Sequence, residues 1–313
     1  MPLFRRGARP DSSAAEAAAG AAQASIDALT SGSLPLRAAE RLSAKGMPYT
    51  SDLSVNELAV GGRFGVSPVA QVMGSSVYHV GWQRSPGNTW FAQAGSQELS
   101  VLSEAWNEAR RLAFDRLQQE AALVGAHAVV GLDLSIGGRD WMAGAIEYVV
   151  FGTAVRESSL ASDPVLTNLS LQDYAQLRAA GYRPAGLFGA SAVFYVVSSW
   201  SQQSIQTGWG SWANQELPDF TRGLYDAREV VVERITAQAR ASHAAGLVGV
   251  TIAYDIREVE VDRGGTRTDL IVTMHALGTG IAEADPAGAL PPARVSLDLS
   301  RTPRRDHILG GVR

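Results

Sequence analysis

The sequence lacks cysteine altogether across its 313 residues. This absence excludes disulfide bonds, thiolate-bound metals, iron–sulfur clusters and cysteine nucleophiles. No apolar run reaches the roughly 18 uninterrupted residues that a membrane-spanning helix needs. Polar and alanine-rich sequence, rather than an apolar core, follows Arg5 and Arg6 near the amino terminus. We therefore expect no secretory signal, no transmembrane segment and a cytoplasmic location.

Charge of either sign is also scarce, because only 19% of the residues are charged and the formal net charge is −4. Such a chain has no basic field to attract nucleic acid or anionic lipid, so we expect no nucleic-acid partner. Hydrophobic residues make up 46% of the sequence. A chain of this length and composition can bury an ordinary core without covalent staples.

The sequence contains two diverged copies of one segment. Leu53–Ala59 resembles Leu169–Ala175 at an offset of 116 residues (169 − 53). The offset becomes 118 (215 − 97) where Gln97–Leu99 meets Gln215–Leu217, and it holds as far as Gly131 against Gly249. It is 126 (278 − 152) in the last strand, where Gly152-Thr153 matches Gly278-Thr279. Chance does not keep matches colinear over this length, so the sequence predicts a tandem repeat.

The repeat divides the chain into five parts. Its two copies are separated by a short polar linker and flanked by terminal segments of biased composition. We predict an Ala/Ser-rich arm that is partly helical or disordered (1–50), a first repeat (51–156), a linker (157–166), a second repeat (167–282) and a Pro/Arg-rich tail (283–313).

Each copy predicts the same order of elements. Ser54 and Ser170 suit the N-cap of a short first helix. A strand and a loop follow, and then apolar residues at helical spacing predict a long amphipathic helix beginning near Ser100 and near Asp219. Gly125 and Gly246 are expected to end these helices. The predicted strands are 69–80, 132–136 and 145–155 in the first copy and 185–197, 250–256 and 270–281 in the second.

These elements place the chain in the α+β class, as two tandem copies of a small domain with a largely antiparallel sheet packed by one long amphipathic helix. One helix covers only one face of a sheet, so the other face needs cover from a second copy or a second subunit. The sequence therefore predicts a homo-oligomer.

Three segments of the first copy carry a family resemblance. They are Ala109–Arg111, Gly125–Gly131 and Phe151–Val155, read as Ala-Arg-Arg, Gly-Ala-His-Ala-Val-Val-Gly and Phe-Gly-Thr-Ala-Val. This pattern resembles the YbjQ-like family, which is also labelled a heavy-metal-binding domain, with His127 where Asn or Asp is usual. The resemblance implies a compact α+β domain that forms ring-like homo-oligomers, pentamers in type, and implies no known reaction.

Histidine supplies the candidate metal ligands of this sequence, which has no cysteine. His79 and His127 are weak candidates, because no pair of histidines has the spacing of a zinc site. Their aligned residues in the second copy, Tyr195 and Ala245, are not ligands. We expect no bound cofactor, and ordinary surface or strand histidines are the simpler interpretation.

Tryptophan clusters in the loop before each long helix. A loop that combines tryptophan with glycine, serine and glutamine is typical of recognition surfaces, since rigid aromatic rings give contact area at low entropic cost. The same rings could instead cover an open sheet face or a subunit interface, which we favour. The residues of this predicted interaction surface are Trp82, Trp90, Phe91, Trp200, Trp209 and Trp212.

No nucleophile elbow, phosphate loop or paired acidic signature is present, so we expect a protein that is not an enzyme. The leading hypothesis is an oligomeric scaffold or binding protein. The alternative is a protein that binds a small ligand or a metal ion at a repeat or subunit interface. An enzyme with a composite site between the copies is a third, less favoured hypothesis.

Overall fold

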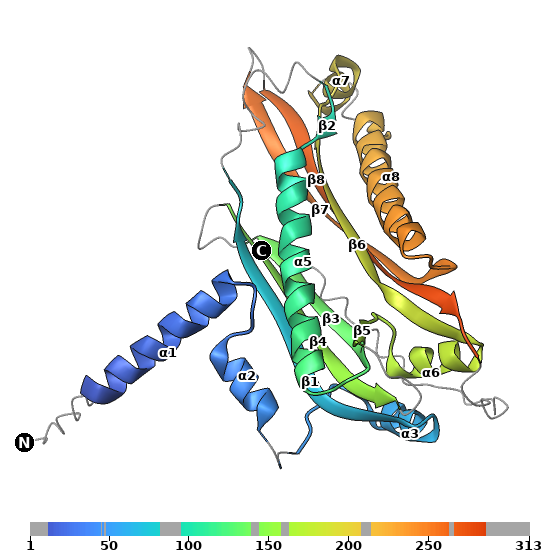
Figure 1. Cartoon of the computed structure of the whole chain (residues 1–313). Helices are drawn as coiled ribbons and strands as arrows, with labels where there is room; N and C mark the ends of the chain where they lie inside the picture. Colours follow the sequence, from blue (N-terminus) through green and yellow to red (C-terminus); the bar gives the residue numbers. More distant parts are fainter. Residues whose placement is uncertain are drawn as a thin grey trace, which may run out of the picture.

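The computed structural model describes residues 12–44, 46, 48–81, 95–138, 144–157, 163–207, 214–262 and 266–285. Two twisted sheets stand side by side, and a long helix packs along each of them (Figure 1). The predicted α+β class is therefore confirmed. The strand order is β1-β4-β3-β5 in one sheet and β2-β6-β8-β7 in the other.

The same order of elements occurs twice along the chain. The first series is α3 (Val55–Arg63), β1 (Val66–His79), β2 (Gln97–Glu98), α5 (Ser100–Leu123), β3 (Ala128–Gly138) and β4 (Ala145–Glu157). The second series is β5 (Val165–Leu166), α6 (Leu171–Ala179), β6 (Tyr182–Val196), α7 (Trp200–Thr207), α8 (Pro218–Ala241), β7 (Gly246–Asp262) and β8 (Thr266–Glu283). The short helix α7 was not expected from the sequence.

Local irregularities of the backbone also repeat. The register of β1 against β4 shifts after Pro68, and that of β6 against β8 shifts after Pro184. Gly131 and Gly249 adopt left-handed φ values of 63° and 60°, each at a bulge between the third and last strands of its copy. Because bulges redirect a strand, sharing them keeps the two sheets alike in curvature.

Serine begins the first helix of each copy, as predicted. The Ser54 hydroxyl accepts a hydrogen bond from the Glu57 N–H at 3.2 Å, and the Ser170 hydroxyl accepts one from the Asp173 N–H at 3.1 Å. These side chains satisfy amide groups that have no partner inside the helix.

The long helices end differently from each other. Gly125 follows α5 with a left-handed φ of 66°, as predicted for a helix stop. After α8 the left-handed residue is His243, with a φ of 55°, while Gly246 opens β7. The prediction that Gly246 ends the helix is wrong, because the position aligned with Gly125 is occupied by a histidine that adopts the same conformation.

The core of the first copy depends on close approach of α5 to β1. Ala113 on α5 is fully buried, and a Cβ added at Gly74 on β1 would lie 1.9 Å from the Ala113 carbonyl oxygen. Only glycine permits this distance. The fully buried stripe of α5 is Ala109, Ala113, Leu117 and Ala121, and α8 presents Ala227, Val231, Ile235 and Ala239 at the same spacing.

The two sheets exchange short strands. β2, from the first series, pairs with β6, whereas β5 pairs in parallel with β3. The segment 157–166, predicted as a linker, therefore includes a strand of the first sheet. Each copy completes its sheet with residues from the other, which makes the two copies one folded unit.

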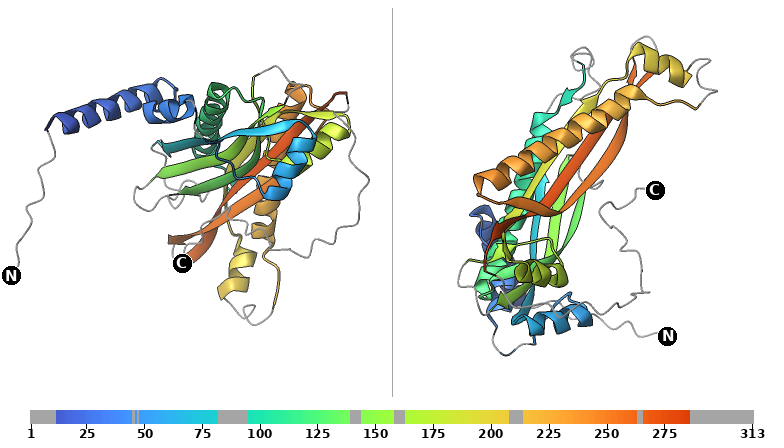
Figure 2. Two further views of the ribbon diagram at one scale, coloured as in Figure 1. Left: turned by 90° about the horizontal axis from the view of Figure 1, so that it is seen from below. Right: turned by 90° about the vertical axis from the view of Figure 1, so that its right-hand side faces the viewer.

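The predicted amino-terminal arm contains α1 (Ser12–Thr30) and α2 (Leu36–Ser43). Figures 1 and 2 show α1 projecting away from both sheets, while α2 lies beside α5. The Arg41 guanidinium lies 3.5 Å from the Glu120 carboxylate and ties α2 to α5. In the described part of the chain, no helix is long and apolar enough to cross a membrane.

Candidate assembly surfaces

The helix α5 of the first copy covers the outer edge of the second sheet. Side chains of α5 extend the hydrogen-bond ladder between β2 and β6. The first is Ser103, whose hydroxyl accepts a hydrogen bond from the Val193 N–H at 2.9 Å. The Asn107 side chain then bonds both backbone groups of Ser191, at 3.0 Å to the N–H and 2.9 Å to the carbonyl oxygen. Polar side chains of α5 thus act as a continuation of the strand β2 along the edge of β6.

An ion pair accompanies this edge contact. Arg234, on α8, donates one hydrogen bond to the Ser191 carbonyl oxygen at 3.0 Å and another to Glu98 Oε2 at 2.8 Å. Glu98 belongs to β2 and Arg234 to the second copy. The pair therefore joins the two copies beside the added strand.

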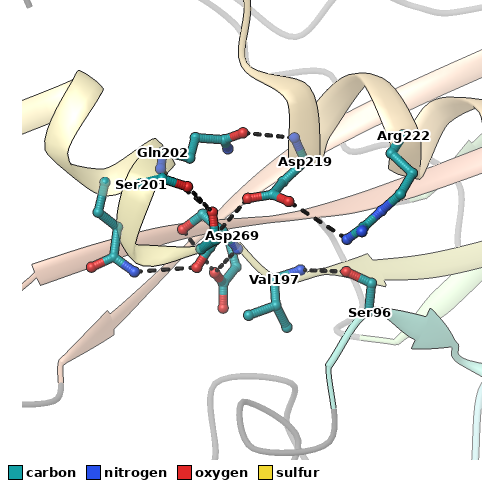
Figure 3. A network of polar contacts seen from close by, with 10 residues as sticks. Ser96, Val197, Ser201, Gln202, Asp219, Arg222 and Asp269 are labelled. Atoms are coloured by element: carbon teal, nitrogen blue, oxygen red, sulfur yellow. Dashed lines mark hydrogen bonds and ion pairs between the residues drawn. The ribbon is translucent and has the colours of Figure 1, made fainter. Parts of the chain in front are cut away.

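Figure 3 shows the end of this joint, where β6 leads into α7. The Val197 N–H donates to the Ser96 hydroxyl at 3.0 Å, one step beyond the β2 pairing. Asp219, at the start of α8, accepts a bond from the Ser199 N–H at 2.8 Å, and its own N–H donates to Gln202 Oε1 at 2.8 Å. These bonds hold α7 and α8 against the end of the second sheet.

A second contact between the copies lies at the other end of the molecule. Leu171 and Tyr174 on α6 are fully buried against the first sheet, in a cluster with Val130 and Val155. The Tyr174 hydroxyl donates to Glu157 Oε2 at 2.5 Å. Burial, followed by the bond to Glu157, raises the pKa of Tyr174 far above its usual range, so the phenol stays protonated.

Arg178 completes this buried group. Its Nε and Nη2 atoms each lie 3.2 Å from Glu157 Oε1, and the side chains of Arg178 and Glu157 are only 8% and 4% exposed. A carboxylate at the end of β4 is thereby neutralised by a cation from the next copy. We call the residues Glu157, Tyr174 and Arg178 the polar trio.

The residues of the first sheet that align with the covered part of the second sheet are exposed. Val193 is 1% exposed and Leu277 is 7% exposed, whereas their aligned residues Val77 and Phe151 are 55% and 38% exposed. Met73, aligned with Gly189, is also 38% exposed. The first sheet therefore shows an apolar patch where the second sheet carries α5.

The second copy shows matching exposed surfaces of its own. Ile136 on β3 is 6% exposed in the shared core, but its aligned residue Tyr254 on β7 is 54% exposed. Along β7 the exposed apolar stripe is Val250, Ile252, Tyr254 and Ile256. In the first helix of each copy it is instead the first copy that is exposed. Val55 on α3 is 83% exposed, while its aligned residue Leu171 on α6 is buried.

The structure does not bring together the two histidines proposed as metal ligands. His79 is exposed and pairs with Ala145 at one end of β4, while His127 lies near Glu157 at the other end. The His127 Nδ1 atom is 2.7 Å from the Glu157 carbonyl oxygen. No group of three potential ligands from His, Asp and Glu occurs in the part of the chain that the structure describes.

A buried histidine that the sequence did not single out lies in the joint. The His275 ring is 2.8 Å from the Ser191 hydroxyl through Nδ1 and packs edge-on to Trp106 with ring centres 4.9 Å apart. Burial, followed by the charge of Arg110, lowers the pKa of His275 to about 3. The ring is neutral at pH 7, and burial of both His275 and Ser191 keeps a substrate away from this pair. It has a packing role, because it joins α5 to the second sheet.

A cavity of about 880 Å³ lies between the long helices and the end of β1. Its lining carries charged residues of both signs, among them Arg110, whose Nη1 atom donates to the Asn107 side-chain oxygen at 2.8 Å. The charged or aromatic residues around it are Tyr78, His79, Glu98, Glu104, Glu108, Arg110, Arg111 and Arg234.

Most of the predicted tryptophan surface lies outside the described residues: Trp82, Trp90, Phe91, Trp209 and Trp212. Trp200 is the first residue of α7. The role of these rings in contacts stays a prediction. Trp106, by contrast, is 7% exposed in the core.

The comparisons with known proteins agree with the fold. Residues 60–158 match the YbjQ family model, which is described as "Putative heavy-metal-binding". Encapsulin nanocompartment protein Rv1762c of Mycobacterium tuberculosis is 35% identical over 251 residues, covering 76% of this chain and 92% of that protein.

Two shorter relatives match over about half of their own length. The UPF0145 protein of Clostridium novyi is 42% identical over 59 residues, which is 19% of this chain and 55% of that protein. The UPF0145 protein TTHA1944 of Thermus thermophilus is 44% identical over 59 residues, or 19% of this chain and 50% of that protein.

The long match extends through both copies, beyond the single domain that the family model covers. The element order and the shared bulges relate the second copy to the first. The chain therefore belongs to the YbjQ-like family, with the matched domain at residues 60–158 followed by a second copy of the same fold.

Proposed function

We propose that this chain is a non-enzymatic scaffold protein of the cytoplasm that acts by associating with further copies of itself. The observation that carries the proposal is the contrast in exposure between aligned residues. Val193 is buried by the other copy, while Val77 is 55% exposed on the first sheet. Monomeric proteins rarely leave contiguous apolar surface of this kind uncovered.

The long relative supports an assembling protein, because its name places it in an encapsulin nanocompartment. The two exposed surfaces of this chain lie on different copies. A protein with two different adhesive surfaces associates head to tail, which produces a closed ring or an open filament.

A specific observation favours the alternative of a small-ligand binding protein. The cavity of about 880 Å³ lies between the two copies, as that alternative requires. Arg110 reaches it with a pKa that burial lowers from its ordinary value. Its mixed charges suit a small polar molecule that carries both signs of charge better than a bare cation.

Light scattering on the full chain, with and without a chelator, tests the scaffold. We expect a mass of several chains that the chelator leaves unchanged. A mass of one chain at all accessible concentrations would contradict the scaffold and favour the cavity as the functional site. A mass that falls with chelator would instead show that a metal holds the chains together.

A further inference from the structure

The contact between the two copies inside one chain offers a template for the contact between chains. It consists of an added segment, residues 96–107 of the first copy, and a covered edge, the edge of β6. We call the added segment the donor side and the covered edge the acceptor side; the terms do not refer to hydrogen-bond donors and acceptors. The second copy has its own version of the donor side in residues 214–225. The first copy has its own version of the acceptor side in the edge of β1.

Thr50 and Glu120 of the same chain accept the N–H groups of Gln71 and Met73 on the edge of β1, and the acceptor version lies beyond them, at Val77 to His79. β1 is the last strand of its sheet, and among the described residues no strand pairs with its outer side. The residue that donates its N–H to the Ser103 hydroxyl in the second sheet is Val193, and its counterpart on β1 is Val77. A strand placed here would cover Val77, which is 55% exposed.

The donor version in the second copy is exposed to solvent. Asn214, Gln215 and Glu216 are exposed and align with Ser96, Gln97 and Glu98. Thr221 aligns with Ser103 and keeps a hydroxyl group that can accept a backbone N–H. The chemistry of the template is therefore preserved at the start of this segment, although Tyr225 replaces Asn107.

Charge complementarity fixes which residues meet. Arg116 donates to the Ser75 carbonyl oxygen at 2.6 Å, as its aligned residue Arg234 donates to the Ser191 carbonyl oxygen at 3.0 Å. Arg234 also bonds Glu98 through its Nη2 atom, whereas Arg116 forms no ion pair within the described part of the chain and bonds Ser75 through Nη1 alone. The counterpart of Glu98 is Glu216, and no ion pair holds it in the described part of the chain.

We infer that a second copy of this chain covers the edge of β1, with residues 214–217 of one chain added as a short strand and Glu216 bonded to Arg116 across the interface. In this register Glu216 lies opposite Tyr78, and Gln215 lies opposite His79, as Glu98 and Gln97 lie opposite Phe194 and Tyr195 within the chain. The inference rests on the proposed self-association and specifies its surface.

The remaining exposed surfaces agree with this placement. When α8 of one chain covers β1 of the next, the stripe on β7 faces the same neighbour, as the aligned stripe on β3 faces the second sheet. The exposed α3 of the neighbour then takes the place that α6 has within the chain, with Val55 in the position of Leu171. The exposed apolar surfaces on β1, β7 and α3 thereby all lie in the proposed contact between chains.

Charge reversal tests the interface in the full-length protein. Glu216→Arg would place two cations together, and we expect the protein concentration at half-assembly to rise about tenfold or more. Val77→Asp, on the opposite surface, is expected to have a similar effect. Both positions are exposed in the single chain, so circular dichroism should show folded proteins.

The matched control is Glu233→Arg. Glu233 is exposed on the same helix, and its aligned residue Asp115 bonds Arg111 of its own helix rather than the other copy. This variant should assemble like the parent chain. Arg116→Glu should weaken assembly, and mixing it with Glu216→Arg should restore association between unlike chains, because each contact between the two variants joins opposite charges.

The outcomes separate the inference from the proposed function. A parent chain that stays single contradicts both. A parent chain that assembles, together with Glu216→Arg and Val77→Asp proteins that assemble equally well, would overturn the interface and leave the scaffold standing. Loss of assembly in both variants, with the control unaffected and recovery on mixing, supports the interface.

Discussion

Removing the cation of the polar trio should strongly destabilise the joint between the two copies. The Glu157 and Arg178 side chains are 4% and 8% exposed, so the Arg178→Met change leaves a carboxylate in a poorly hydrated site with Tyr174 still bonded to it. Breaking a buried ion pair from one side costs about 3–5 kcal/mol. At about 2 °C per kcal/mol for a chain of this size, Tm should fall by about 6–10 °C.

Thermal unfolding followed by circular dichroism at pH 7 measures this loss. Glu157→Gln combined with Arg178→Met removes both charges, and the double variant should be more stable than Arg178→Met alone. Arg183→Met is the control, because Arg183 is exposed at the start of β6. If Arg178→Met unfolds at the same temperature as the control, the trio does not stabilise the joint and the reasoning fails.

Two further predictions concern the packing of the long helix. Gly74→Ala places a methyl group 1.9 Å from the Ala113 carbonyl oxygen, so denaturant unfolding should show a loss of about 1–3 kcal/mol, while Gly62→Ala, which meets nothing, should show none. The pKa of His275 is about 3 in the folded chain, against about 6.5 for an unperturbed histidine. The unfolded chain therefore binds the proton first, and stability falls as pH drops from about 6.5 towards 3. His275→Gln should lose less stability over this range, by up to about 1.4 kcal/mol per pH unit, and parallel pH profiles would contradict the low pKa.

Much of the fold was predictable because its signals are local. The spacing of apolar residues predicted α5 and α8, and the serines at 54 and 170 predicted the first helices. The alignment of the copies also placed Gly131 opposite Gly249, which share a bulge. Hydrogen bonds and burial within a few residues of each other determine these features, so one sequence is enough to find them.

The contacts between the copies were not predictable in the same way. Glu157 was assigned to a linker, yet it is buried by Tyr174 and Arg178 because α6 folds back onto the first sheet. His275 looked like an ordinary strand histidine, and only the packing against Trp106 shows its place in the joint. Such partners are distant in sequence and leave no spacing pattern.

The polar trio also explains how two similar copies avoid pairing in the wrong order. The residues aligned with Glu157, Tyr174 and Arg178 are Glu283, Leu58 and Gly62, so the corresponding site in the proposed contact between chains would hold a carboxylate but neither the phenol nor the guanidinium. A first-copy helix α3 placed in the joint inside the chain would remove the bonds that Tyr174 and Arg178 make to Glu157. Because removing one partner of a buried ion pair costs about 3–5 kcal/mol, this joint favours α6 over α3. Divergence of the two copies therefore makes α6 the helix that fits inside the chain and leaves α3 for the neighbour in the proposed assembly, whose joints would then alternate in a fixed order.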